Sequence, residues 1–159
     1  QKVAEEVVAS SSKCAFLSTP SIYFSLPKDS EVKQASWVFD LDDQWSSDPH
    51  YFKYDFNKPT EVPSDLHHTF DCVVIDPPFI TREVWEKYAE TAKLLLAASG
   101  KVIGTTVAEN EAMLGEIIPH MTATKFKPSI PNLIYQYNLF TSFPPKVLCE
   151  PNPEIPADD

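Results

Sequence analysis

The segment Val73–Phe79, VVIDPPF, places an acid, two prolines and an aromatic ring directly after a hydrophobic run. The valines and the isoleucine predict a buried strand, and Asp76 follows at its carboxyl end. Pro77 and Pro78 can neither continue a sheet ladder nor occupy a helix interior, so they fix the backbone in one extended shape. With Phe79 as a flat wall, this corner could orient an amine so that its nitrogen lone pair faces an electrophile. The alternative is a proline-rich turn with an exposed acid.

Acidic side chains also end two other predicted strands. Asp40 and Asp42 come at the end of a predicted strand over 36–41, and Asp55 comes near the end of one over 50–56. In doubly wound sheets, a carboxylate after the second strand typically binds the hydroxyl groups of a ribose. Asp55 could accept a hydrogen bond from an adenine amine. A single acid at a strand end is more often a solvated terminus, but acids on successive strands at one edge predict a nucleoside site.

The loop after the first predicted strand, residues 17–23, lacks the glycines of a phosphate-binding loop, and the whole chain has only three glycines. A glycine-rich loop lets the backbone approach a dinucleotide closely. Here the hydroxyl and N–H groups of Ser18 and Thr19 would have to bind the cofactor instead. This arrangement suits S-adenosylmethionine, which has no phosphate, better than it suits a dinucleotide.

The elements that position these residues alternate between strand and helix. Strands are predicted over 13–18, 36–41, 50–56, 70–75 and 101–106, and helices over the first twelve residues, 21–26, 81–98 and 109–118. This alternation predicts an α/β fold with a mostly parallel, doubly wound sheet. Segments 123–128 and 133–143 are expected to close it as an antiparallel hairpin.

The domain is predicted to span residues 1–143, and the proline-rich residues 144–159 are expected to form a flexible tail. Because the first residues read as an amphipathic helix entered partway, we expect the natural start of the domain to be missing.

The charge and the cysteines restrict partners and compartment. The net charge is −10, with 13 basic and 23 acidic residues, and Arg82 is the single arginine. Nucleic-acid binding depends on arginine forks and basic stripes, so this chain alone is a poor partner for nucleic acid, whereas its field favours a basic protein. Cys14, Cys72 and Cys149 are odd in number and widely spaced, which predicts a reducing, cytoplasmic location and no metal site. No apolar run approaches the ~20 residues that cross a bilayer, so no membrane partner is expected.

Four segments in order, the STPS loop, FDLD, YDFNKP and DPPF after the fourth strand, resemble the probable N6-adenine methyltransferase family. Members of that family include the lysine methyltransferases of eukaryotic elongation factor 1-alpha. The resemblance covers about residues 1–143 and implies a Rossmann-like class I methyltransferase that uses S-adenosylmethionine. It implies a target-amine site formed by Asp76, Pro77, Pro78 and Phe79, and a cofactor site formed by Ser18, Thr19, Asp40, Asp42 and Asp55.

The expected reaction is methyl transfer to an amine nitrogen, with a lysine of a protein such as elongation factor 1-alpha as the leading substrate. Adenine N6 in RNA or DNA is an alternative, which the acidic composition disfavours. A second alternative is an inactive fold that serves as a binding module, and the intact DPPF argues against it. Residues 134–140 read IYQYNLF where the lysine enzymes usually have an N-E-F-R-like signature.

Overall fold

The structure, a computed structural model, describes residues 2–126 and 137–150. Within these ranges, one seven-stranded sheet has the order β3-β2-β1-β4-β5-β7-β6. Its strands are β1 (Cys14–Leu17), β2 (Trp37–Asp40), β3 (Tyr51–Lys53), β4 (Phe70–Ile75), β5 (Leu96–Val107), β6 (Thr122–Ala123) and β7 (Tyr137–Thr141). The first five strands pair in parallel, and β7 pairs antiparallel with both β5 and β6. The predicted α/β fold with a mostly parallel sheet is confirmed.

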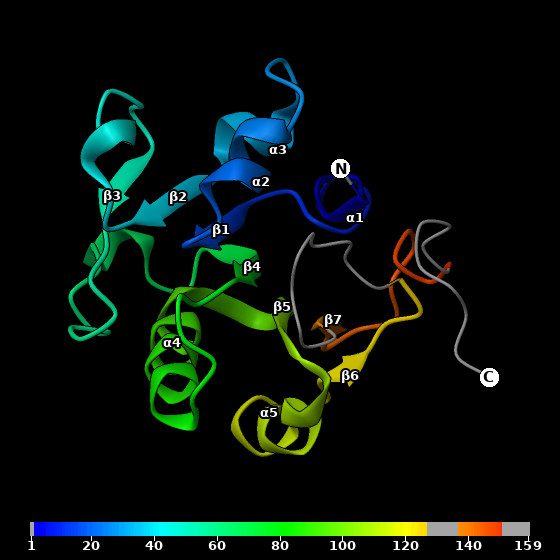
Figure 1. Ribbon diagram of the computed structural model, residues 1–159. Helices are drawn as coiled ribbons and strands as arrows, with labels where there is room; N and C mark the ends of the chain where they lie inside the picture. The colour runs from blue at the N-terminus through cyan, green and yellow to red at the C-terminus, as the bar shows by residue number, and fades with distance from the viewer. Residues whose placement is uncertain (1, 127–136, 151–159) are drawn as a thin grey trace.

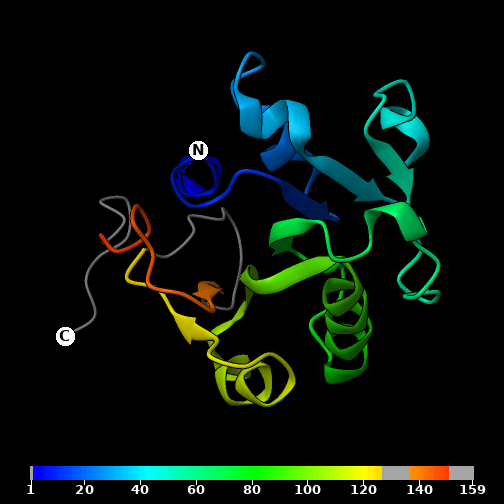
Figure 2. The same ribbon diagram turned by 180° about the vertical axis from the view of Figure 1, so that it is seen from behind.

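Helices cover both faces of the sheet, with α1, α2 and α3 on one side and α4 and α5 on the other (Figures 1 and 2). They are α1 (Lys2–Ser10), α2 (Pro20–Ser25), α3 (Glu31–Ala35), α4 (Arg82–Leu95) and α5 (Glu111–Ile117), with short 3-10 helices η1 (Asp43–Trp45), η2 (Ser64–Leu66) and η3 (Ala108–Asn110). Successive strand residues point to opposite faces, so each strand supplies two cores. Phe16 and Val74 pack in the core beneath α1 and α2, whereas Leu17 and Val73 pack in the core beneath α4.

The C-terminal strands form the predicted antiparallel arrangement. Ala123 of β6 lies opposite Phe140 of β7, and Val107 at the end of β5 lies opposite Tyr137. The expected connection, residues 129–132, and the adjoining ends of both predicted segments lie outside the described residues.

The helix predicted over 81–98 is too long at its C-terminal end. Helix α4 ends at Leu95, and Leu96 begins β5. Leu96 pairs with Phe70, and the register shifts between Phe70 and Cys72. The sequence LLLAA suits a helix as well as a buried strand, so the pairing with β4 decides its conformation.

Two shorter segments also differ from the prediction. Strand β3 is confined to Tyr51–Lys53, so Asp55 lies in the loop beyond the strand end. Helix α3 was not predicted, because five residues are too few for a clear helical period. Its local signal is Ser30, whose side chain caps the helix by accepting a hydrogen bond from the N–H of Lys33.

The N-terminal helix holds the segment that follows β7. The side chain of Glu6 is fully buried, and its carboxylate accepts hydrogen bonds from the backbone N–H groups of Lys146 (3.1 Å), Val147 (2.7 Å) and Leu148 (2.9 Å). The hydroxyl of Ser10 donates to the same carboxylate. Leu148 is itself fully buried in the core beneath α1. The first part of the predicted tail therefore packs against the domain, and the boundary at residue 143 stays a prediction.

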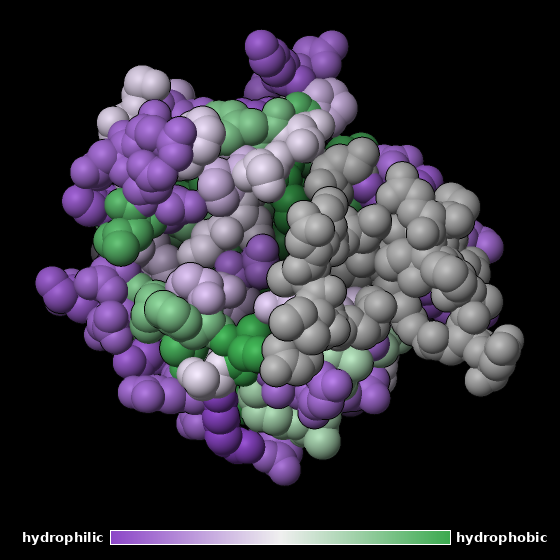
Figure 3. Space-filling view, viewed as in Figure 1, coloured by the Kyte–Doolittle hydropathy of each residue, from purple (hydrophilic) through white to green (hydrophobic). Residues whose placement is uncertain are grey.

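On the face shown in Figure 3, outside the grey region, hydrophilic side chains follow the rim and hydrophobic side chains form smaller groups between them. In the described part of the chain, no helix combines the length and apolar character needed to cross a membrane.

Candidate active site

The DPPF corner lies directly at the carboxyl end of β4, next to the central strand β1. The N–H of Asp76 donates to the carbonyl of Leu17 at the end of β1 (3.3 Å). Pro77 is buried, whereas Pro78 and Phe79 are exposed, with Phe79 59% exposed. The prolines end the strand, and Thr81 then caps α4 by accepting from Val84 N–H (3.4 Å). The strand order reverses between β1 and β4, and ligands of doubly wound sheets bind at such a switch point.

The carboxyl group of Asp76 has an unusual protonation equilibrium for a surface acid. Its side chain reaches solvent, but protein surrounds it on most sides. This desolvation raises the pKa of Asp76 from 3.8 to about 6. The group is therefore mostly ionised at neutral pH, as an acceptor of hydrogen bonds must be, but it can bind a proton in mildly acidic solution.

An aromatic wall extends sideways from Phe79. The ring centroids of Phe79 and Phe56 lie 6.4 Å apart with an edge-to-face orientation, and Phe56 stacks on Tyr88 at 5.8 Å. The ammonium group of Lys87 lies 5.7 Å from the centroid of the Phe56 ring. This wall connects the DPPF corner with the loop after β3, which carries Asp55.

The loop after β1 is held in a shape that glycine usually adopts. Ser18 has a φ of 60°, in the left-handed region. Its N–H donates to Phe39 O (2.8 Å), and its hydroxyl lies 2.6 Å from the hydroxyl of Tyr88. Burial raises the pKa of Tyr88 to about 12, so the phenol stays protonated and can donate to Ser18. These contacts hold a serine in a backbone conformation that glycine usually adopts.

Thr19 supplies an unused polar atom in the same loop. The residue is 3% exposed, and its Oγ1 has no hydrogen-bond partner in the described part of the chain. Buried hydroxyl groups are rarely left unsatisfied. An unpaired hydroxyl at the end of β1 fits a site where a ligand supplies the missing partner.

The three acids of the predicted cofactor site differ in how they are engaged. Asp40 accepts from the N–H of Asp42 (2.9 Å), and Asp55 accepts from the N–H of Asn57 (2.9 Å), each through one oxygen. Asp42 instead uses both oxygens on Gln44, accepting from its backbone N–H (3.0 Å) and from its side-chain amide. These bonds lower the pKa of Asp42. Asp40 and Asp55 therefore retain a carboxylate oxygen for a ligand, and Asp42 fixes the turn beside Asp40.

Residues 1–145 match the family model described as probable N6-adenine methyltransferase. The chain belongs to this family. It is 26% identical over 147 residues to human EEF1A lysine methyltransferase 1, a match that covers 89% of this chain and 68% of the relative. It is 30% identical over 142 residues to the mouse protein of the same name, with 87% and 64% covered. The chain thus spans about two thirds of the length of these relatives.

Solved structures show the same fold for this member of the methyltransferase family. The N-methyltransferase NodS from Bradyrhizobium japonicum WM9, in complex with S-adenosyl-L-homocysteine, superposes with a TM-score of 0.58 at 9% identity. The match covers 89% of this chain and 82% of NodS. The predicted Rossmann-like class I methyltransferase fold is confirmed.

Two residues at the carboxyl edge of this methyltransferase-family sheet were not predicted. Tyr88 holds Ser18, although its place in the apolar stripe of α4 indicated only core packing. Leu41 directly follows Asp40 and is 57% exposed. It places an apolar surface, which can pack against a nucleoside base, beside a carboxylate, which can bind the ribose. The signal in the sequence is a leucine between acids in FDLDD. The strand predicted over 36–41 included this leucine, so it was not recognised as a surface residue.

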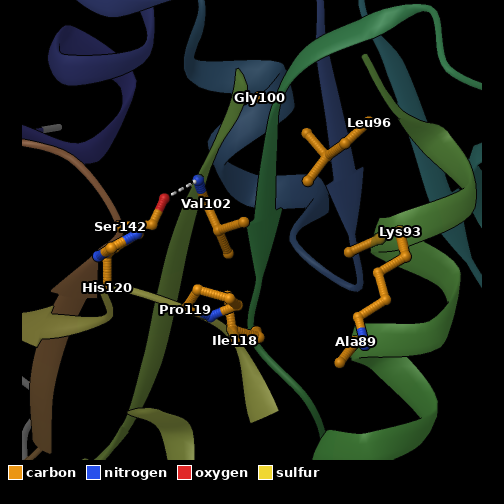
Figure 4. A pocket seen from close by; sticks show the side chains of 10 residues that line it. Ala89, Lys93, Leu96, Gly100, Val102, Ile118, Pro119, His120 and Ser142 are labelled. Carbon is orange, nitrogen blue, oxygen red and sulfur yellow. Dashed lines mark hydrogen bonds between the residues drawn. The ribbon is translucent and has the colours of Figure 1, made fainter. Parts of the chain in front are cut away.

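A cavity of about 220 Å³ lies at the opposite edge of the methyltransferase-family sheet (Figure 4). It is lined by the C-terminal part of α4, the first half of β5 and the loop after α5, including Leu96, Gly100 and His120. Ser142 accepts from Val102 N–H (2.8 Å) at its wall. The amino ends of the parallel strands meet at this edge, so the cavity is separate from the candidate active site. Among the described residues, no group of three His, Cys, Asp or Glu side chains could hold a metal ion.

Proposed function

We propose that the protein transfers a methyl group from S-adenosylmethionine to the side-chain nitrogen of a lysine in another protein. The observation that carries this proposal is the DPPF corner, which places a carboxylate and an exposed aromatic ring beside the loop after β1. S-adenosylmethionine is the methyl donor, because the family is a methyltransferase family and solved neighbours hold S-adenosylhomocysteine. Several relatives are named protein-lysine methyltransferases, which supports lysine as the acceptor.

The residues at the carboxyl edge fit this cofactor. Among the residues that the structure describes, the Thr19 hydroxyl has no hydrogen-bond partner, and Asp40 and Asp55 each use one carboxylate oxygen and leave the other for the adenosine. Ser18 shapes the loop, and Asp42 fixes the turn that presents Asp40. When bound, the cofactor supplies an electrophilic methyl group on a sulfonium ion.

At the acceptor, this chain's own residues prepare the nitrogen. A free lysine side chain has a pKa of about 10.4, so its ammonium group must lose a proton before the nitrogen can attack the methyl carbon. A lysine side chain that packs against the rings of Phe79 and Phe56 loses water on that side, which disfavours its ammonium form. Asp76 and the proline-fixed carbonyls accept the remaining N–H groups, which directs the nitrogen lone pair toward the methyl carbon. The lysine ammonium first gives one proton to solvent. The carbon–nitrogen bond to the methyl group then forms as the bond between the methyl carbon and the sulfur of the methyl donor breaks.

Charge and relatives indicate the substrate. A chain with a net charge of −10 attracts a basic protein, and its single arginine, Arg82, forms ion pairs with Glu86 and Glu116. Relatives named for EEF1A make elongation factor 1-alpha the first substrate to test. Cys14, Cys72 and Cys149 are free thiols, which supports a cytoplasmic reaction.

The decisive experiment is incubation with methyl-labelled S-adenosylmethionine and total cell lysate, with and without nuclease. A labelled protein band that survives nuclease and is reproduced with purified elongation factor 1-alpha supports the proposal. Label that nuclease removes would indicate adenine in nucleic acid as the substrate. Cofactor binding by calorimetry without any labelled product would indicate a binding module.

The cofactor site gives a second test. Asp40→Ala and Asp55→Ala should each weaken binding of S-adenosylmethionine by about 1–3 kcal/mol, through hydrogen bonds lost to the adenosine. Calorimetric titration measures the change. Asp65→Ala, which removes an exposed acid of η2 before β4, is the matched control and should leave the affinity unchanged. Wild-type affinity in both test variants would place the two acids outside the cofactor site.

A further inference from the structure

Asn110 makes side-chain contacts that its position in the chain does not explain. It is the last residue of η3 and occupies the N-cap position of α5, yet it makes no side-chain cap bond. Its amide nitrogen instead donates to the backbone carbonyl of Ile80 (2.8 Å) and to the hydroxyl oxygen of Thr106 (2.9 Å). Ile80 directly follows the DPPF corner, thirty residues away in the chain.

The orientation of this amide is determined by its partners. A backbone carbonyl can only accept, so the NH₂ end of Asn110 must face Ile80. Thr106 is fully buried and holds the second N–H, which keeps the side chain in this rotamer. Asparagine is among the best N-cap residues, and a cap contributes about 1 kcal/mol. The side chain forgoes that bond and connects two loops at the carboxyl edge.

The middle of the corner offers few polar attachments, although Pro77 is buried. Asp76 N–H is bound to Leu17 O at the start of the corner, and Pro77 and Pro78 have no N–H group. Phe79 is 59% exposed and is therefore weakly held by packing. The hydrogen bond from Asn110 to Ile80 ties down the other end, immediately after Phe79.

We infer that Asn110 is a positioning residue for methyl transfer, which holds the distal end of the DPPF corner so that Phe79 stays against the acceptor amine. This inference rests on the proposed function. The acceptor site is then assembled from two loops, with the reacting surface after β4 and its support after β5. The role acts on the acceptor and not on the cofactor, because the side-chain hydrogen bonds of Asn110 go to Ile80 and Thr106 and not to the loop after β1 or to the acids after β2 and β3.

The test is Asn110→Ser. Serine is neutral and caps helices as well as asparagine does, but it is too short to reach Ile80. We expect kcat to fall by ~10–100-fold, as a small displacement of a positioned group can cause. The dissociation constant for S-adenosylmethionine should stay within about twofold. Tm should fall modestly, because the buried hydroxyl of Thr106 loses a hydrogen-bond partner. Asn110→Asp, which turns an oxygen toward the carbonyl, should lower kcat at least as much.

Ser30→Ala is the contrasting control. It removes a real side-chain cap, that of α3, which lies on the other face of the sheet. It should lower Tm and leave kcat unchanged, so that a loss of kcat in Asn110→Ser cannot be attributed to lower stability alone.

Hydrogen exchange gives a readout that does not need activity. The amides from Phe79 to Arg82 should exchange faster in Asn110→Ser than in the wild type. If the wild type is active and Asn110→Ser keeps full kcat, or if the affinity for S-adenosylmethionine falls as much as kcat does, the inference is wrong. If the wild type methylates nothing, the proposed function fails, and unchanged exchange at the corner would then overturn the inference by itself.

Discussion

Replacing Asp76 with alanine should lower the methyl-transfer rate by ~100-fold or more, as expected when one positioned polar group is lost from an active site. Asp76 would touch the acceptor nitrogen and not the nucleoside, so the affinity for S-adenosylmethionine should hardly change. Single-turnover rates and calorimetry separate the two effects. Phe79→Ala should also slow transfer, because it opens the wall beside the amine.

The protonation of Asp76 also predicts how the stability of the protein depends on pH. The pKa of Asp76 is raised from 3.8 to about 6, so between these values the folded protein binds more protons than the unfolded chain. The ionised carboxylate therefore lowers stability as the pH rises through this window, and the cost is complete above about pH 6. Asp76→Asn should raise Tm at about pH 7.5 and leave it unchanged below about pH 4.

Activity should respond in the opposite sense. The wild-type rate should fall as the pH drops through about 6, because protonation removes the ionised acceptor. Should Asp76→Ala keep near-wild-type activity on a lysine-bearing protein, the corner would be only a proline-rich turn.

Replacing Glu6 with alanine should lower the free energy of unfolding by about 3 kcal/mol. The substitution removes the acceptor of the N–H groups of Lys146 and Val147, which are partly buried, and of the N–H group of Leu148, which is buried. Buried donors without partners are costly, and bonds to a charged acceptor are stronger than neutral ones. Chemical unfolding at about pH 7 measures the loss.

The neighbouring acid is the matched control. Glu5 is exposed and forms an ion pair with Lys2 at 3.8 Å, so Glu5→Ala should cost less than about 0.5 kcal/mol. A chain that ends at Phe143 lacks all three donors and buried Leu148, and should be destabilised at least as much as Glu6→Ala. Equal stability of Glu6→Ala and Glu5→Ala would show that the buried carboxylate does not hold this segment.

The pH dependence of the Glu6 contribution has a defined sign. Burial by itself raises the pKa of Glu6. The hydrogen bonds from Ser10 and from three backbone N–H groups lower this pKa by more than burial raises it, so the net pKa lies below its ordinary value. The stabilisation is therefore present above the ordinary value of 4.5 and is lost as the pH falls through the lowered pKa. The difference between wild type and Glu6→Ala should shrink in acid.

The sequence by itself determined the features that short-range patterns encode. The run before Asp76 was identified as a buried strand from its composition, and the prolines after it indicated the corner at β4. The alternation of strands and helices was sufficient for the α/β class and the parallel sheet, because hydrophobic period and turn residues depend on neighbours in the chain. Ordered motifs identified the family, and they placed Ser18, Thr19, Asp40 and Asp55 at the edge where the strands end.

Only the tertiary structure decided which of these residues are held, and by what. The hydroxyl of Tyr88 reaches Ser18 from seventy residues away, the amide of Asn110 reaches Ile80, and Glu6 binds Leu148 across nearly the whole chain. The end of α4 at Leu95 was likewise decided by pairing with β4 and not by local propensity. These contacts could not be predicted because they require the strand order and the register of neighbouring strands. The pKa of Asp76 has the same origin, since desolvation depends on every atom packed around the carboxylate and not on the residues beside it in the chain.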